Sequence, residues 1–273
     1  MWLKTGTNTD MHRVIVELWG LSITSWGVML VIAFVVGIWL AEKGAIKYGI
    51  PKTIIQDLSV VVIISGIVGG RVTYIIENWS HYAKYPGEMF KVWEGGLIFY
   101  GGLGLAVLFG IIFLKRKKVN ILKVMDLIAP LIVLGLGLAR VGCFLNGCCF
   151  GKPTSLPWGV VFPANSPPRW VFSEHIRIHP TQLYESIAGV CMFLILLMIE
   201  KKKRFSYGYL FGIFLATYGG WRFTTDFLRY YESKALILFG LTHSQIVSIL
   251  MILVAVVLLI HRRHPKSLTK TRE

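Results

Sequence analysis

Apolar residues in this chain are gathered into long blocks rather than spread at the period of an amphipathic helix or strand. A block of about 20 apolar residues is long enough to cross a bilayer core of roughly 30 Å as a helix. The pattern therefore predicts an all-α integral membrane protein with seven transmembrane helices and no β-strands. The predicted spans are approximately Ile23 to Ala41, Ile54 to Ile76, Gly96 to Leu114, Ile121 to Ala139, Pro180 to Ile199, Tyr207 to Leu228 and Ile246 to Ile260.

Composition agrees with a membrane protein. Charged residues make up 16% of the chain, against about a quarter of a soluble domain. The net charge of +15 comes largely from short basic clusters between apolar blocks, such as Lys115 to Lys118 and Lys201 to Arg204. Such clusters are typical of the cytoplasmic ends of membrane helices. We therefore expect the membrane, and no nucleic acid, as the partner of these clusters.

The distribution of lysine and arginine among the loops predicts the orientation. The loops after the first, third and fifth spans and the C-terminal tail are richer in basic residues than the loops on the opposite side. The positive-inside rule then puts the N-terminus in the periplasm and the C-terminus in the cytoplasm. Residues 1–273 are predicted to form a single polytopic membrane domain with an outer-side loop at about 141–179. Residues 1–20 lack the pattern of a cleavable signal peptide, so we expect the first span to act as the insertion signal.

Ionisable residues inside the predicted spans mark a candidate site. An ionisable group within the bilayer costs several kcal/mol unless it is paired or hydrated. With the predicted orientation, four arginines lie toward the outer face, accompanied by the acids Glu185 and Asp226; these arginines are Arg71, Arg140, Arg222 and Arg229. Arginine suits phosphate recognition, so the excess of arginine over acid indicates an anionic ligand, most simply a phospholipid headgroup. The alternative is that these side chains extend to the interface or pair with the two acids.

Five segments resemble one known family. The run RVGCFLNGCCFGKPT from Arg140, followed by PWGVVFP from Pro157, is similar to the signature of the prolipoprotein diacylglyceryl transferases. Further similar segments, in the same order as in that family, are GGRVTYIIENW from Gly69, GGLIFYGGL from Gly95, HPTQLYES from His179 and the segment from Tyr218 to Arg229. The resemblance covers nearly the whole chain.

The resemblance implies an activity and a set of site residues. Members of the family transfer the diacylglyceryl group of phosphatidylglycerol to the lipobox cysteine thiol in the signal peptide of a prolipoprotein, releasing glycerol phosphate. They are multi-pass proteins of the bacterial inner (plasma) membrane whose site faces the periplasmic leaflet. By position, Arg140 matches the arginine that binds the headgroup, and Arg222 matches a second arginine important for activity. We accordingly predict Arg140, Tyr100 and Arg222 as catalytic residues. The predicted substrate-binding residues are Arg140, Asn146, Gly151, Arg71, His179, Gln182, Glu185, Asp226 and Arg229. No cofactor is expected.

The chain also departs from the family pattern. The family has His where this chain has Tyr100, Asn at Cys143, Glu at Cys148 and Arg at Lys152. The candidate general bases are Tyr100, His179 and Glu185. The alternative hypothesis is a phospholipid-binding membrane paralogue that is non-catalytic or has altered chemistry. A transporter is a third hypothesis, disfavoured because the sequence shows no internal repeat.

Three cysteines, Cys143, Cys148 and Cys149, cluster at the outer end of the fourth span. The first interpretation is packing in a glycine-rich turn, with or without a disulfide. The second is a reactive thiol. The third is a metal site with His175 or His179, but the spacing is not a standard zinc pattern, and we predict no metal. Cys191, in mid-span, is expected to be a packing residue.

Overall fold

The structure of the protein is a computed structural model. This structure describes residues 14–18, 21–164, 166–172, 175–202, 206–231, 236–238 and 240–262. The chain divides into two compact units, the first built from Met1–Gly37 and Ile128–Glu273 and the second from Ile38–Leu127. Each unit is considered by itself. The basic cluster that ends at Arg204, the N-terminal segment up to residue 13 and the tail after residue 262 lie partly or wholly outside the described residues.

Each predicted span coincides with a helix. The helices are α1 (Ser25–Lys47), α2 (Lys52–Glu77), α4 (Phe99–Arg116), α5 (Ile121–Asn146), α7 (Thr181–Lys201), α8 (Tyr209–Asp226) and α9 (His243–Arg262). Six of them, all but α8, are long and apolar enough to cross a membrane. The prediction of a helical integral membrane protein is thereby confirmed, whereas a seventh span through α8 stays a prediction.

In the second unit, α2 and α4 approach closely because glycines face each other. A Cβ atom on Gly69 would lie 2.5 Å from the carbonyl oxygen of Gly101, and one on Gly102 would lie 2.7 Å from that of Gly66. Small residues at such positions let the backbones of membrane helices come into contact. Beyond α2, the chain forms the short helices α3 (Trp79–Tyr82), η1 (Pro86–Phe90) and η2 (Val92–Glu94) before it enters α4.

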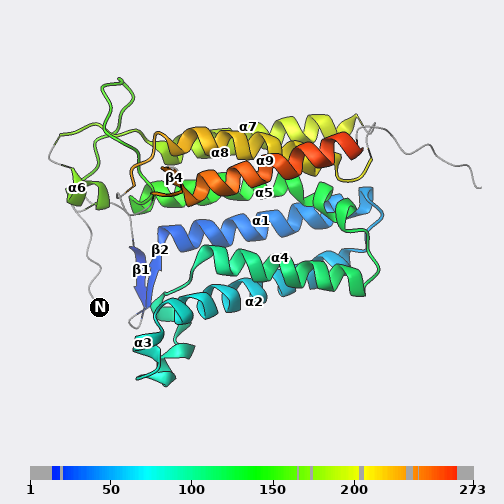
Figure 1. The fold of residues 1–273 in the computed structure, drawn as a ribbon, viewed down its shortest axis with the longest axis horizontal. Coiled ribbons are helices and arrows are strands. Elements are labelled where there is room, and N and C mark those ends of the chain that lie inside the picture. Colours follow the sequence, from blue (N-terminus) through cyan, green and yellow to red (C-terminus); the bar gives the residue numbers. More distant parts are fainter. Residues whose placement is uncertain are drawn as a thin grey trace, which may run out of the picture. The chain divides into compact units, whose positions relative to one another are not determined.

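In the first unit, α7, α8 and α9 lie alongside the later part of α5 (Figure 1). Their shared core is apolar and is made of Ala129, Val133, Leu196, Leu210, Phe214, Leu215 and Ala255. Between α5 and α7 the contact is again glycine-mediated, since a Cβ atom on Gly189 would lie 3.0 Å from the Cα atom of Gly137. The core holds the helices whose ends carry the candidate site.

Large apolar side chains also cover much of the molecular surface. Val31 and Val35 of α1, Ile64 of α2, Ile187 of α7 and Val257 of α9 are each more than half exposed. A soluble protein rarely exposes contiguous apolar faces of this kind. Helices that are apolar on their outer faces fit a hydrocarbon environment.

The expectation of no strands was wrong at two places. β1 (Val14–Leu18) pairs antiparallel with β2 (Leu21–Thr24), and β3 (Leu236–Leu238) pairs antiparallel with β4 (Leu241–Thr242). β1 contains alternating Val and Ile residues, which favour extended backbone, so the residues predicted to begin the first span, from Ile23, are partly in a hairpin. Both sheets have only two strands and leave the helical architecture intact.

The connection between α5 and α7, predicted to begin at about residue 141, begins later than predicted. Helix α5 continues through Val141 to Asn146, and the following segment contains the short helix α6 (Pro167–Val171). The helix ends at Gly147, which has φ +72°. Its N–H donates to the carbonyl of Phe144 (3.1 Å), and the N–H of Cys148 donates to that of Cys143 (3.1 Å). These two bonds form a Schellman motif, in which a glycine in the left-handed region closes the helix.

Candidate active site

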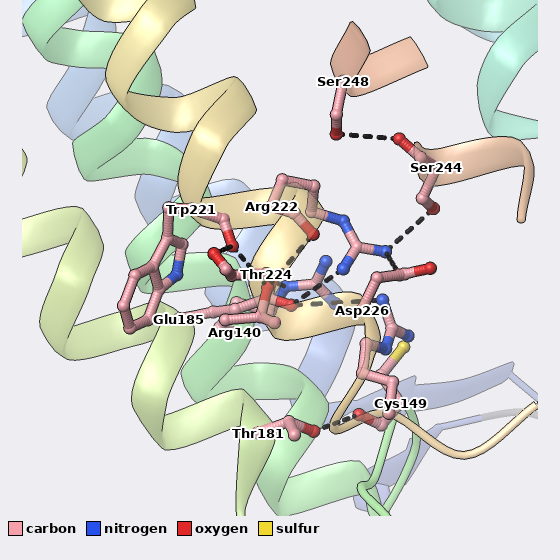
Figure 2. A network of polar contacts seen from close by, with 12 residues as sticks. Arg140, Cys149, Thr181, Glu185, Trp221, Arg222, Thr224, Asp226, Ser244 and Ser248 are labelled. Carbon is pink, nitrogen blue, oxygen red and sulfur yellow. Dashed lines mark hydrogen bonds and ion pairs between the residues drawn. The ribbon is translucent and has the colours of Figure 1, made fainter. Parts of the chain in front are cut away.

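Three helices bring charged side chains together around Glu185, which is on α7 and buried (Figure 2). Its carboxylate pairs with Nε of Arg140 from α5. It also faces Nη1 of Arg222 from α8 at 3.4 Å and Nη1 of Arg229 at 4.0 Å. One carboxylate thus serves three guanidinium groups.

Arg222 is anchored on its other side by a second acid. Its Nη2 lies 2.9 Å from Oδ1 of Asp226, one helical turn later. The same nitrogen donates to the hydroxyls of Tyr231 (3.0 Å) and Ser244 (2.8 Å). Asp226 in turn accepts hydrogen bonds from the hydroxyls of Tyr231 (2.5 Å) and Thr242. Arg222 is therefore held in place by a network that joins α8 to the start of α9.

The cluster of three arginines and two carboxylates carries one net positive charge. Arg229, which is 9% exposed, has its Nε buried without a hydrogen-bond partner among the described residues. A buried, unpaired donor on a charged group is costly, and the carboxylate that Arg229 approaches among the described residues is that of Glu185, at 4.0 Å. Arg229 is thus the guanidinium best placed to donate a hydrogen bond to an anionic oxygen of a ligand.

The Schellman motif at the end of α5 stacks two of the cysteines. Cys143 and Cys148 occupy the positions that contact each other across this motif. Cys149 follows with φ +61°, which turns the chain so that its sulfur joins the other two. The three Sγ atoms lie within 4.8 Å of one another, and Nη1 of Arg140 is 3.8 Å from Sγ of Cys143. Among the described residues, these three sulfurs form a group that could hold a metal ion.

Side chains at the start of α7 hold the cysteine turn in place by donating hydrogen bonds to the carbonyl groups of the turn. The hydroxyl of Thr181 donates to the carbonyl of Cys149 (2.9 Å), and Nε2 of Gln182 donates to that of Cys148 (2.7 Å). The N–H of Gly151 donates to the carbonyl of His179 (3.1 Å). A Cβ atom on Gly151 would lie 2.6 Å from that oxygen, so only glycine fits there. Gln182 and Gly151, with Asn146 as the last residue of α5, surround the cysteine turn.

His179 lies at the edge of the site. Its Nδ1 is 3.2 Å from the hydroxyl of Tyr184, which also accepts a hydrogen bond from the indole of Trp158 (2.9 Å). Burial lowers the pKa of His179 below its usual value of 6.5, because the charged form is disfavoured away from water. At neutral pH the imidazole is therefore uncharged and able to accept a proton.

Two of the predicted site residues belong to the second unit. The guanidinium of Arg71 donates to the carbonyls of Glu88 (2.6 Å), Gly95 (2.8 Å) and Met89 (2.9 Å), and so closes the segment between α2 and α4. Tyr100, in the first turn of α4, is 47% exposed. A role for these two residues at the substrate stays a prediction.

Three contributors were missed by sequence reasoning. Tyr231, Ser244 and Thr242 supply hydroxyls to the Arg222–Asp226 pair. Hydroxyl residues near helix ends are common, and no spacing in the sequence distinguishes these three. Only the fold brings them to the two charges.

The four cysteines, all of which lie in the described ranges, carry free thiols. Cys191, expected to be a packing residue, is exposed on α7. Its position falls on the outward face of the helix, next to the exposed Val190. Cys191 plays no part in the cysteine cluster.

Comparison with known proteins identifies the family of this chain. The sequence profile of the family described as prolipoprotein diacylglyceryl transferase matches residues 13–261. A phosphatidylglycerol–prolipoprotein diacylglyceryl transferase from Clostridium tetani is 36% identical over 219 residues, which are 80% of this chain and 86% of the relative. The protein of the same name from Finegoldia magna is 32% identical over 263 residues, 96% of this chain and all of the relative. That from Nitratidesulfovibrio vulgaris is 39% identical over 210 residues, 75% of this chain and 76% of the relative. Because the family profile and these relatives cover most of the sequence, the chain belongs to the prolipoprotein diacylglyceryl transferase family.

Proposed function

We propose that this protein transfers the diacylglyceryl group of phosphatidylglycerol to the lipobox cysteine thiol of a prolipoprotein signal peptide and releases glycerol phosphate. Membership of the family supports the reaction class. The observation that carries the assignment to this site is the buried Nε of Arg229, unpartnered within the described part of the chain, beside the Arg140–Glu185 pair. A phosphate oxygen is the partner that such a donor lacks.

Arg140 and Arg229 bind the phosphodiester in this proposal, and Arg222 maintains their geometry. Guanidinium groups match phosphate oxygens in shape and charge. In the reaction, the acceptor sulfur loses its proton and attacks the diacylglyceryl carbon that carries the phosphoester oxygen. The C–S bond forms, the C–O bond breaks, and the electron pair leaves on the oxygen of glycerol phosphate. Preorganised donors stabilise the charge that develops on that oxygen.

The proposal extends to the membrane location and the orientation of the protein. We assign the protein to the bacterial inner membrane with seven spans, α8 included, the N-terminus in the periplasm and the C-terminus in the cytoplasm. Two observations support α8 as a span: it packs into the same apolar core as α7 and α9, and its charged residues are paired. In this orientation the outer ends of α5, α7 and α8 meet at the periplasmic leaflet, where the lipobox cysteine of a translocating signal peptide arrives.

The test is transfer of label by the purified protein from phosphatidylglycerol labelled in its diacylglyceryl part to a lipobox peptide. We expect transfer, and a loss of at least about 100-fold for Arg140→Ala, the size of effect seen when a donor to a developing oxyanion is removed. Arg177→Ala is the control, because Arg177 is an exposed arginine of the outer loop. A folded protein that binds the lipid but transfers no label contradicts the proposal.

A second candidate, a phospholipid-binding paralogue without this chemistry, is favoured by Tyr100 at the position where the family has His. Tyr100→His separates the two candidates. If the chain is a transferase in which Tyr100 is a weaker general base than His, the substitution raises the transfer rate. If the chain only binds lipid, transfer stays absent while lipid binding is unchanged.

A further inference from the structure

The cysteine cluster holds three sulfur atoms that the phosphate-binding residues leave unused. Cys143, Cys148 and Cys149 all carry free thiols whose sulfurs lie within 4.8 Å of one another. A disulfide uses two of three thiols and leaves the third over, whereas a metal ion uses all three. The arrangement of the turn is also constrained from outside, since Thr181 and Gln182 hold its carbonyl groups.

The spacing of the sulfurs fits a thiophilic cation. A Zn–S distance of about 2.3 Å puts the sulfurs of a tetrahedral site roughly 3.8 Å apart, within the observed limit. Thiolates select soft or borderline cations such as Zn²⁺ and Cu⁺ over Mg²⁺ or Ca²⁺. Three protein ligands leave the fourth position of a tetrahedral zinc ion open, which is the arrangement of catalytic rather than structural sites.

A positively charged side chain lies against the cysteine cluster. Nη1 of Arg140 is 3.8 Å from the sulfur of Cys143. In Figure 2 the sulfur of Cys149 points toward the network of arginines and carboxylates. A cation at the three sulfurs thus lies beside the guanidinium groups assigned to the lipid phosphate.

We infer that Cys143, Cys148 and Cys149 bind one thiophilic divalent cation, of which Zn²⁺ fits best, and that this cation activates the acceptor thiol as its fourth ligand. The three protein thiols release their protons to solvent as the metal–sulfur bonds form. The acceptor thiol releases its proton in the same way, because a coordinating thiol is deprotonated outright. Its sulfur then attacks the diacylglyceryl carbon as described above, and the electron pair of the broken C–O bond leaves with glycerol phosphate. The activation step rests on the proposed function, whereas the cation site does not.

Metal binding is tested without reference to activity. The full-length protein, purified in detergent with a phosphine reductant, is titrated with Cd²⁺ while sulfur-to-metal charge-transfer absorption is followed. We expect one Cd²⁺ per chain, and prior loading with Zn²⁺ should weaken the apparent binding of Cd²⁺ by competition for the same site. Cys143→Ser, Cys148→Ser and Cys149→Ser each weaken binding at least about tenfold, the lower end of what disturbing a metal site costs, and Cys191→Ser leaves it unchanged. Absence of the absorption band, or a band that persists in all three variants, overturns the site.

Activation is tested by label transfer before and after removal of the metal with a chelator. We expect a decrease of at least about tenfold, restored by Zn²⁺ in the native chain but not in Cys149→Ser. Transfer that is unaffected by chelation overturns the activation step. If Cd²⁺ binds as expected and no form of the protein transfers label, the proposed function fails while the cation site stands, so the two failures are distinguishable.

Discussion

Among the individual residues of the site, Glu185 has the largest electrostatic role because its buried carboxylate faces three guanidinium groups. Burial makes each of these contacts stronger than a surface ion pair, and it makes the loss of one partner more costly. The carboxylate cannot be replaced by another acid of the cluster, because Asp226 is engaged with Arg222, Tyr231 and Thr242.

Glu185→Gln should therefore destabilise the protein by about 3–5 kcal/mol, the usual cost of breaking a buried ion pair. The reason is that three buried guanidinium groups then share a single acid. The measurement is the denaturation midpoint in detergent. Asp57→Asn is the matched control, because Asp57 and Lys117 form an exposed pair 3.6 Å apart, worth at most about 1 kcal/mol. Equal midpoints for both variants would contradict this assignment.

Arg229→Gln should have the opposite effect, weakening the binding of phosphatidylglycerol more than it lowers the stability of the protein. The Nε of Arg229 has no hydrogen-bond partner among the described residues, and its contact with Glu185 is long, at 4.0 Å, so its removal should lower the denaturation midpoint much less than Glu185→Gln does. Loss of hydrogen bonds to a charged phosphate costs about 1.5–3 kcal/mol, which corresponds to a rise in KM for phosphatidylglycerol of about 10- to 150-fold. The transfer assay measures KM, with Arg177→Gln as the control. A lowered midpoint with unchanged KM would assign Arg229 a structural role instead.

Among the helices, the contact between α2 and α4 depends on the absence of side chains. A Cβ atom on Gly101 would lie 1.9 Å from the Thr73 hydroxyl oxygen and 2.8 Å from the carbonyl oxygen of Gly69. Gly104, one turn later in the same helix, has nothing within 4 Å of its Cβ position. The two glycines have the same helical backbone and differ in what surrounds them.

Gly101→Ala should lower the free energy of unfolding by about 1–3 kcal/mol, as overpacking does. Gly104→Ala should be neutral or raise it by up to about 1 kcal/mol, because alanine is the better helix former. The measurement for both is the denaturation midpoint in detergent. A similar effect of the two substitutions would show that helix propensity, rather than close packing, governs these positions.

The end of α5 illustrates how a local motif creates a site. Gly147 closes the helix in a Schellman motif, and the motif brings Cys148 over Cys143. As a linear pattern, the spacing C-x4-C-C is not a standard zinc motif, and the sequence therefore disfavoured a metal site. The reversal of the chain at Gly147 removes that objection, since it brings together sulfurs that are five residues apart along the chain.

For the whole molecule, the arrangement of basic loops predicts which side of the membrane each loop faces. Lys84 lies between α2 and α4 on the predicted outer side, and Lys117 lies after α4 on the predicted cytoplasmic side. With the four native cysteines replaced by serine, Lys84→Cys should react with a membrane-impermeant maleimide in intact cells. Lys117→Cys should react only after the membrane is permeabilised. Labelling of the second variant in intact cells would contradict the orientation.

The sequence was sufficient for the helices and for the family. Blocks of about 20 apolar residues need no tertiary context to be recognised, because the bilayer thickness sets their length, and all seven predicted spans coincide with helices. The exact ends were less predictable. Residues 141–146 continue α5, and Ile23 lies in a hairpin, because helix ends depend on local capping rather than on hydrophobicity.

The partners of the charged groups could be established only from the folded chain. The sequence contains Arg140, Glu185 and Arg229 far apart, and their convergence depends on the packing of α5, α7 and α8 around a common core. Arg222 is anchored by the hydroxyls of Tyr231 and Ser244, whereas the Nε of Arg229 has no partner in the described part of the chain. Hydrophobicity is a property of each segment and can be read along the chain, whereas hydrogen bonding and charge pairing are properties of side chains brought together in space.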